Sequence, residues 1–104
     1  RRMIHTGLYF DVPENTEIQV RPRSGMSIKK GITVINTPGT VDENYTGEVC
    51  ILIINLSNED VVITNGERIA QGILQSYMPM SFDEVDELSE TARGYGSFGS
   101  TGTN

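Results

Sequence analysis

The feature that most restricts the fold of this chain is a series of short apolar runs separated by turn-forming residues. Alternating apolar side chains and short β-branched runs of this kind are typical of β-strands. The run at 49–56 is continuously apolar, which predicts a strand covered on both faces. Glycine, proline and the pair Asn65-Gly66 interrupt the pattern as turns do. We therefore expect strands within residues 8–12, 18–20, 32–35, 49–56, 61–64 and 69–77.

Helical periodicity is nearly absent from the sequence. Only residues 81–90 predict a short helical turn, which Ser81 could cap and which Asp83 and Glu84 favour near its N-terminal end. Many short strands joined by frequent turns predict an all-β fold: a sandwich, a barrel or a jelly roll.

Composition and charge limit the classes of protein to which this chain can belong. The chain has 104 residues, enough for one domain, and a formal net charge of −6, which argues against a nucleic-acid-binding protein. Hydrophobic residues make up only 37%, so burial at a subunit interface is expected. The sequence has no apolar run of membrane-spanning length, so we expect no membrane partner. The single cysteine, Cys50, has no histidine or cation near it in sequence and is predicted to be a core residue in a cytoplasmic protein.

The C-terminal segment 93–104 is rich in glycine and hydroxyl side chains and has almost nothing apolar to bury. It cannot fold alone, but its groups suit a nucleotide. Arg93 can bind phosphate oxygens, and Ser100, Thr101 and glycine N–H groups can donate to others. Phe98 can stack on a base. The alternative is a disordered tail. The dinucleotide fingerprint G-x-G-x-x-G in this segment is rejected, because too little chain follows for a βαβ unit.

A basic segment at 21–27 is a second candidate for binding the phosphates of a nucleotide. Arg23 can orient an anion, Ser24 can donate to a phosphate oxygen, and Gly25 lets the backbone approach closely. The alternative is an ordinary basic turn at the end of a strand.

The segment 36–48 is a third candidate, because Pro38-Gly39 marks a hairpin-like excursion. Its open backbone groups could pair with the edge of a base. Asp42 could deprotonate a water, and the ring of Tyr45 could pack on a sugar. The alternative is a decorated β-turn. A fourth segment, 66–71, places the amide of Gln71 after a turn and is by itself usually structural.

Together these segments resemble the trimeric dUTPases, the deoxyuridine triphosphate nucleotidohydrolases. That family has five short motifs in fixed order. Segments 22–25, 39–48, 66–71 and 93–102 are similar to the second, third, fourth and fifth. Each match is weak singly, but four in order across nearly the whole chain are specific.

The resemblance implies a role for each matching residue. Asp42 would activate the attacking water, and Tyr45 would pack on deoxyribose and reject ribonucleotides. Phe98 would stack on uracil. The uracil edge would be held by Asn36 and by the backbone of Gly39, Thr40 and Val41. The phosphates would be bound by Arg23, Ser24, Gly25 and Gln71, and the tail would close over them through Arg93, Gly99, Ser100 and Thr101.

The resemblance also implies the architecture and the reaction. The expected fold is a jelly-roll β-barrel domain at 1–90, followed by a flexible arm at 91–104. The expected assembly is a homotrimer whose sites each combine three subunits. The expected reaction is hydrolysis of dUTP to dUMP and pyrophosphate. Mg²⁺ would be held through substrate phosphates and water, with no direct protein ligand.

Two alternatives remain open at this point. A deoxycytidine triphosphate deaminase shares the fold and a related hairpin. Tyr45, three positions after Asp42, and the tail segment 98–102 favour the dUTPase. The family's first motif should precede this sequence, and nothing like it lies before His5-Thr6-Gly7-Leu8. A truncated chain, or one that has lost this motif, would be a catalytically incomplete fragment that acts as an interaction module.

Overall fold

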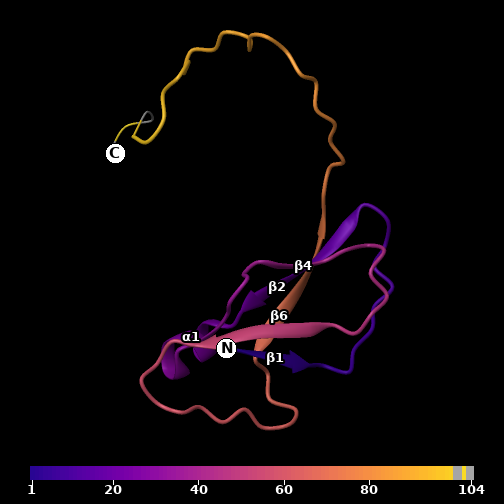
Figure 1. Cartoon of the computed structure of the whole chain (residues 1–104), viewed down its shortest axis with the longest axis vertical. Helices are drawn as coiled ribbons and strands as arrows, with labels where there is room; N and C mark the ends of the chain where they lie inside the picture. The colour runs from indigo at the N-terminus through magenta and orange to yellow at the C-terminus, as the bar shows by residue number, and fades with distance from the viewer. Residues whose placement is uncertain (100–101, 103–104) are drawn as a thin grey trace.

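The computed structural model describes residues 1–99 and 102 and has six strands and one helix among them (Figure 1). The elements in chain order are β1 (Arg2–His5), β2 (Thr16–Pro22), α1 (Ser24–Lys30), β3 (Ile32–Val34), β4 (Gly39–Val41), β5 (Cys50–Asn55) and β6 (Ala70–Ser76).

The strands form two antiparallel three-stranded sheets, in the orders β1-β5-β3 and β4-β2-β6. In the first sheet, β1 pairs with β5 so that His5 lies opposite Cys50. In the second sheet, β2 pairs with β6 over seven positions, from Thr16 opposite Ser76 to Pro22 opposite Ala70. Strand β4 is an edge strand, because it pairs only with β2.

Alternate residues of the strands supply the core. Burial of such side chains is the main favourable term in folding. The buried residues are all apolar, with no buried polar or charged residue among those described: Val12, Val20, Met26, Ile32, Val34, Val41, Val49, Ile51 and Ile53. The two sheets do not close on all sides. They leave an open cavity of about 720 Å³ lined largely by apolar side chains, and Gln71 is the one predicted site residue that lines it.

The helix α1 overlaps the basic segment at 21–27, for which an ordinary turn was the alternative interpretation. Gly31 ends it in the left-handed region, at φ 66°, where its N–H donates to the carbonyls of Met26 and Ser27. Glycine tolerates this conformation because it has no Cβ. Lys29 and Lys30 lie in the last turn, where cations suit the helix dipole. Residues 24–27 are therefore helical rather than the ordinary turn of that alternative.

Four predicted strands are confirmed, at β2, β3, β5 and β6. Residues 8–12 and 61–64 are not strands, although Val12 is buried and Val61 and Ile63 pack against the core. Strand β5 is covered on one face only, because Leu52 is 37% exposed. The helical turn expected at 81–90 is absent, since Phe82, Val85 and Leu88 are all exposed there and have no core to pack against.

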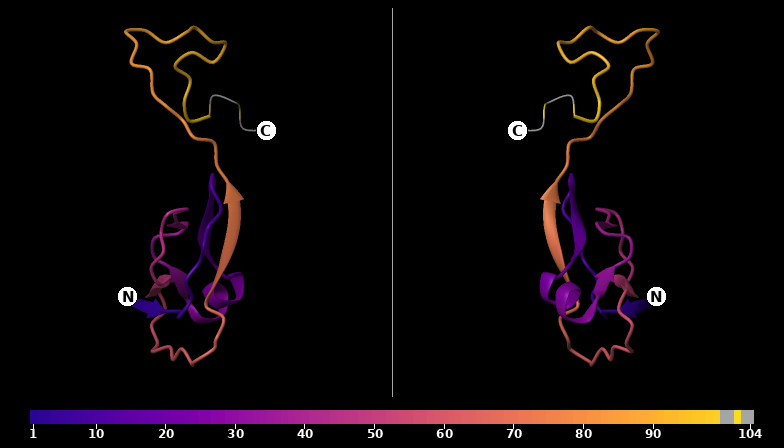
Figure 2. Two further views of the ribbon diagram at one scale, coloured as in Figure 1. Left: turned by 90° about the vertical axis from the view of Figure 1, so that its right-hand side faces the viewer. Right: turned by 90° about the vertical axis from the view of Figure 1, so that its left-hand side faces the viewer.

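Beyond Ser76 the chain leaves the sheets. Residues 77–99 contain neither helix nor strand and extend away from β6, as both views in Figure 2 show. The radius of gyration is 19.1 Å, whereas a compact domain of this length has about 13 Å. The predicted division at residue 90 remains a prediction.

Among residues 1–99 and 102, no helix has the length and apolar character that crossing a membrane requires.

Candidate active site

One group of predicted site residues meets where β2 ends, α1 begins and β6 begins. The guanidinium of Arg23 donates to the carbonyl of Arg68 at 3.1 Å. The amide of Gln71 donates to the carbonyl of Pro22 at 2.9 Å. Ser24 and Gly25 form the exposed start of α1. The structure therefore brings Arg23, Ser24, Gly25 and Gln71 together, with Arg23 held in a half-buried position.

A second group lies on the turn between β3 and β4 and on β4 itself. Asn36 packs against Gly39, where an added Cβ would come within 3.3 Å of the Asn36 amide nitrogen. Val41 points into the core, whereas Thr40 is exposed. Because β4 is an edge strand, its outward backbone groups are not used by β2, which is the arrangement that pairing with a base edge requires.

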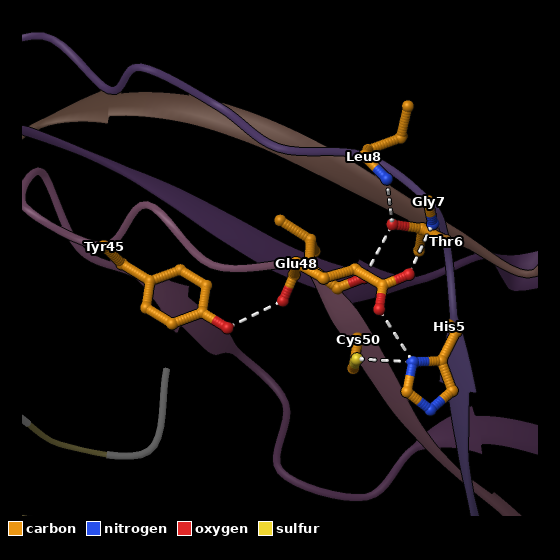
Figure 3. A network of polar contacts seen from close by, with 8 residues as sticks. His5, Thr6, Gly7, Leu8, Tyr45, Glu48 and Cys50 are labelled. Carbon is orange, nitrogen blue, oxygen red and sulfur yellow. Dashed lines mark hydrogen bonds and ion pairs between the residues drawn. The ribbon is translucent and has the colours of Figure 1, made fainter.

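Asp42 follows β4 directly and is exposed. The N–H of Tyr45 donates to the Asp42 carbonyl at 3.1 Å and closes a turn. The Tyr45 hydroxyl donates to the carbonyl of Glu48 at 2.7 Å, which fixes the ring beside the loop (Figure 3). Asp42 and Tyr45 are thus held on one short, exposed loop.

Glu43 anchors this loop to two distant segments. One of its carboxylate oxygens accepts the N–H of Asn15 at 2.7 Å. The other accepts the hydroxyl of Tyr77, the first residue beyond β6. The Tyr77 and Asn15 hydrogen bonds lower the pKa of Glu43. The hydrogen bond to Glu43 raises the pKa of Tyr77, and the nearby charge of Asp42 acts in the same direction. Nothing in the sequence alone indicates the roles of Glu43 and Tyr77, because their pairing spans 34 residues.

Asp42 and Arg23 lie toward opposite ends of β2. Val41 pairs with Ile18, which places Asp42 near the start of that strand, whereas Arg23 follows its last residue. Six residues of strand separate the two positions, a length of about 20 Å. The phosphorus atoms of a triphosphate are separated only by single bridging oxygens, so the backbone distance between Asp42 and Arg23 is much longer than a triphosphate.

The arm meets neither group. The Arg93 side chain donates to the Gly96 carbonyl at 2.8 Å, within the arm itself. Phe98 is fully exposed, and Gly99 lies in the turn that follows it. The predicted contacts of Ser100 and Thr101 lie outside the described residues.

Cys50 has surroundings that the sequence analysis did not anticipate. It is half-buried rather than a core residue, and its Sγ lies 3.5 Å from Nδ1 of His5. The same nitrogen lies 2.8 Å from a carboxylate oxygen of Glu48. Hydrogen bonds from His5 and from the Gly7 N–H lower the pKa of Glu48. His5 and Cys50 are 45 residues apart, so only the pairing of β1 with β5 brings them together.

Comparison with known proteins identifies the family. The family model for dUTPase matches residues 1–102. The chain belongs to the dUTPase family. The deoxyuridine 5'-triphosphate nucleotidohydrolase of Finegoldia magna is 55% identical over 98% of this chain and 71% of that protein. The enzyme of the same name from Bdellovibrio bacteriovorus is 56% identical over 98% of this chain and 68% of that protein.

Solved structures confirm the fold. A mutant dUTPase of Staphylococcus bacteriophage 80alpha with dUpNHpp is 25% identical, with a TM-score of 0.79 over 98% of this chain and 76% of that one. The dUTPase of the same phage with dUPNHPP is 24% identical, with a TM-score of 0.80. The fold is the jelly-roll β-barrel of the dUTPases, although the barrel is not closed within this chain.

Proposed function

We propose that this protein hydrolyses dUTP to dUMP and pyrophosphate, the reaction for which its relatives are named. The observation that carries the proposal is the match of residues 1–102 to the dUTPase family, with relatives 50–56% identical over nearly the whole chain. The exposed position of Asp42 beside an edge strand supports the same reaction.

Asp42 is the general base in this proposal. Its carboxylate takes a proton from a water molecule, and the water oxygen attacks the α-phosphorus of dUTP. The bond from that phosphorus to the oxygen bridging the α- and β-phosphates breaks, and pyrophosphate leaves with the bond's electrons. Asp42 is exposed and its backbone is fixed by Tyr45 and its neighbour Glu43, so the base is accessible and held in position.

The other predicted residues bind the substrate. The outer edge of β4, together with Asn36, reads uracil, and the Tyr45 ring packs on deoxyribose where a ribose hydroxyl would be crowded. Arg23, Ser24, Gly25 and Gln71 bind phosphates, and their clustering at one end of β2 supports this role. The arm closes over the nucleotide through Arg93, Phe98, Gly99, Ser100 and Thr101.

The site is shared between protomers of a homotrimer. The separation of Asp42 and Arg23 along β2 supports a site in which a second copy supplies one of them to each nucleotide. The extended arm is free to reach a further copy. Large apolar side chains that are exposed in the single chain support such an assembly, among them Leu8, Phe10, Ile28, Leu52 and Leu74.

Mg²⁺ fits the site only together with the substrate. Mg²⁺ prefers oxygen ligands and is commonly bound through substrate phosphates and water. In the described part of the chain, the one cluster of three candidate ligands does not include Asp42. Bound in this way, the ion would neutralise charge on the leaving pyrophosphate. The net charge of −6 argues against a nucleic-acid partner, and the single cysteine fits the reducing cytoplasm.

Pyrophosphate release from dUTP in the presence of Mg²⁺ tests the proposal. We expect release from dUTP and much less from UTP, dTTP or dCTP. Formation of deoxyuridine nucleotides from dCTP would instead identify a deaminase. A chain that assembles and binds dUTP but releases no pyrophosphate would refute the proposed hydrolysis and favour an interaction module.

A further inference from the structure

The pairing of β1 with β5 gathers three side chains of different chemistry on one face. His5 lies directly opposite Cys50. Backbone hydrogen bonds continue the pairing beyond the strands, from the Thr6 N–H to the Val49 carbonyl. Side chains alternate along extended chain, so Glu48 projects on the same face as Cys50 while Val49 points into the core. Figure 3 shows the His5 ring, the Glu48 carboxylate and the Cys50 sulfur converging.

The distances suit a shared metal ion. With metal–ligand bonds of about 2.0–2.3 Å, the ligand atoms of a tetrahedral site lie about 3.3–3.8 Å apart. The separation of His5 Nδ1 from Cys50 Sγ is 3.5 Å, within this range. The separation of His5 Nδ1 from the Glu48 oxygen is 2.8 Å. These two atoms would therefore move apart by about half an ångström when both bind the ion. All three ligand atoms lie within 4.8 Å of one another.

The supporting contacts also match a metal site. The second carboxylate oxygen of Glu48 accepts the Gly7 N–H at 2.8 Å, which fixes the direction of the first oxygen. Hydrogen bonds that orient a ligand in this way are a regular part of metal sites. The His5 side chain is 63% exposed and that of Glu48 26%, so an ion can enter from solvent.

We infer that His5, Glu48 and Cys50 form a binding site for a thiophilic divalent cation of the Zn²⁺ class. Thiolate, imidazole and carboxylate are the ligands that Zn²⁺ prefers, and three of them leave a fourth position for water. Mg²⁺ is excluded as the natural occupant, because it favours oxygen ligands in octahedral geometry. The site is separate from Asp42 and does not depend on the proposed hydrolysis.

Binding at this site would link two elements. Strand β1 lies at the edge of its sheet and is held by β5 alone. A metal ion bound to His5 on β1 and to Cys50 on β5 would cross-link the pair. Because the three ligands are assembled only in the folded chain, the ion would stabilise the folded state by mass action.

The test is a titration of the full-length protein with Zn²⁺ against a chromophoric chelator, followed by a Co²⁺ titration read by absorption. The variants are Cys50→Ser and His5→Asn, with Glu14→Gln as a control substitution at an exposed residue outside the site. Cys50 is the only cysteine, so its alkylation rate with and without Zn²⁺ is a third measurement. Unfolding curves without metal establish that each variant is folded.

We expect one Zn²⁺ per protomer, unaffected by excess Mg²⁺, and a thiolate-to-cobalt charge-transfer band. Cys50→Ser should abolish that band. Either ligand variant should weaken Zn²⁺ binding by at least about tenfold, while Glu14→Gln should not. Zn²⁺ should slow alkylation of Cys50 in the parent but much less in His5→Asn. Absence of stoichiometric Zn²⁺ binding, or equal binding by the parent and both folded ligand variants, overturns the inference.

Discussion

The hydroxyl of Tyr77 donates a hydrogen bond to the carboxylate of Glu43, the residue that follows Asp42. Tyr77 is the first residue after β6, in the segment that leads to the arm. The N–H of Tyr77 also donates to the carbonyl of Asn15 at 3.2 Å, and the Asn15 N–H in turn donates to Glu43. The end of β6 and the loop that carries the proposed base are therefore connected through one small polar network.

Replacing this hydroxyl should loosen the Asp42 loop without removing a group that touches substrate. We expect Tyr77→Phe to lower kcat for dUTP by about fivefold, the order expected for loss of one hydrogen bond, with KM nearly unchanged. Steady-state kinetics checks this, with Tyr9→Phe as an exposed control outside the network. If the two substitutions changed kcat equally, Tyr77 would have no specific role in positioning Asp42.

Asp42 itself should dominate turnover. We expect Asp42→Asn to reduce kcat by roughly two to four orders of magnitude, because a positioned general base contributes about that much. Binding of dUTP, measured by calorimetry, should persist, since the amide keeps the size of the carboxylate. Asp60→Asn, an exposed control, should retain activity. Near-normal turnover in Asp42→Asn would show that another group activates the water.

The arm should contribute through its aromatic ring. Phe98 and Tyr95 are both fully exposed, but only Phe98 is assigned to stacking on uracil. We expect Phe98→Ala to weaken dUTP binding by about 1–3 kcal/mol, the range for base–aromatic stacking. Tyr95→Ala is the matched control and should change affinity little. An unchanged affinity in Phe98→Ala would contradict the closing of the arm.

Acid should weaken the fold partly through Glu67. Lys30 donates to its carboxylate at 2.9 Å, and this hydrogen bond is the main reason that the pKa of Glu67 is lowered. A lowered folded-state pKa means that the contribution of Glu67 to stability is present above its unfolded pKa of about 4.3 and is lost as pH falls through the lower folded value.

Glu67→Gln should therefore destabilise the protein at pH 7 and reduce the loss of stability between neutral and acid pH. Urea unfolding at both pH values measures this difference, with Glu14→Gln as an exposed control. The same acid sensitivity in Glu67→Gln and the parent would mean that the pair with Lys30 contributes nothing to folding.

The sequence was most informative where local pattern and tertiary environment agree. The β-branched and alternating runs at β2, β3, β5 and β6 were predicted because half-buried strands have that pattern. Strand β1 was missed, since Arg2–His5 is short and polar at both ends and becomes a strand through its pairing with β5.

Both errors about helices concern short segments, where local sequence signals are weak. Helix α1 spans seven residues, too few to display a periodicity, and only Gly31 and the lysines before it signal its end. Residues 81–90 have favourable N-terminal residues but no surface to pack against, and propensity alone rarely stabilises a helix so short.

The order of the motifs predicted which residues form the candidate site. It did not predict how those residues are arranged in space. The sequence does not indicate that Asp42 and Arg23 lie toward opposite ends of β2, because the position of Asp42 follows from the register of β4 on β2. The meeting of His5 with Cys50 is equally invisible, since it depends on a strand pair 45 residues apart.

Complementation between inactive variants tests the shared site most directly. Asp42→Asn and Arg23→Ala chains, each inactive alone, would be mixed, unfolded and reassembled in equal amounts, and pyrophosphate release from dUTP measured. If each site takes Asp42 and Arg23 from different protomers, about one quarter of the sites in random trimers contain both native residues, and about a quarter of the parent activity should return. If both residues act within one protomer, no site in any mixture is intact, and a mixture that stays inactive would contradict the account.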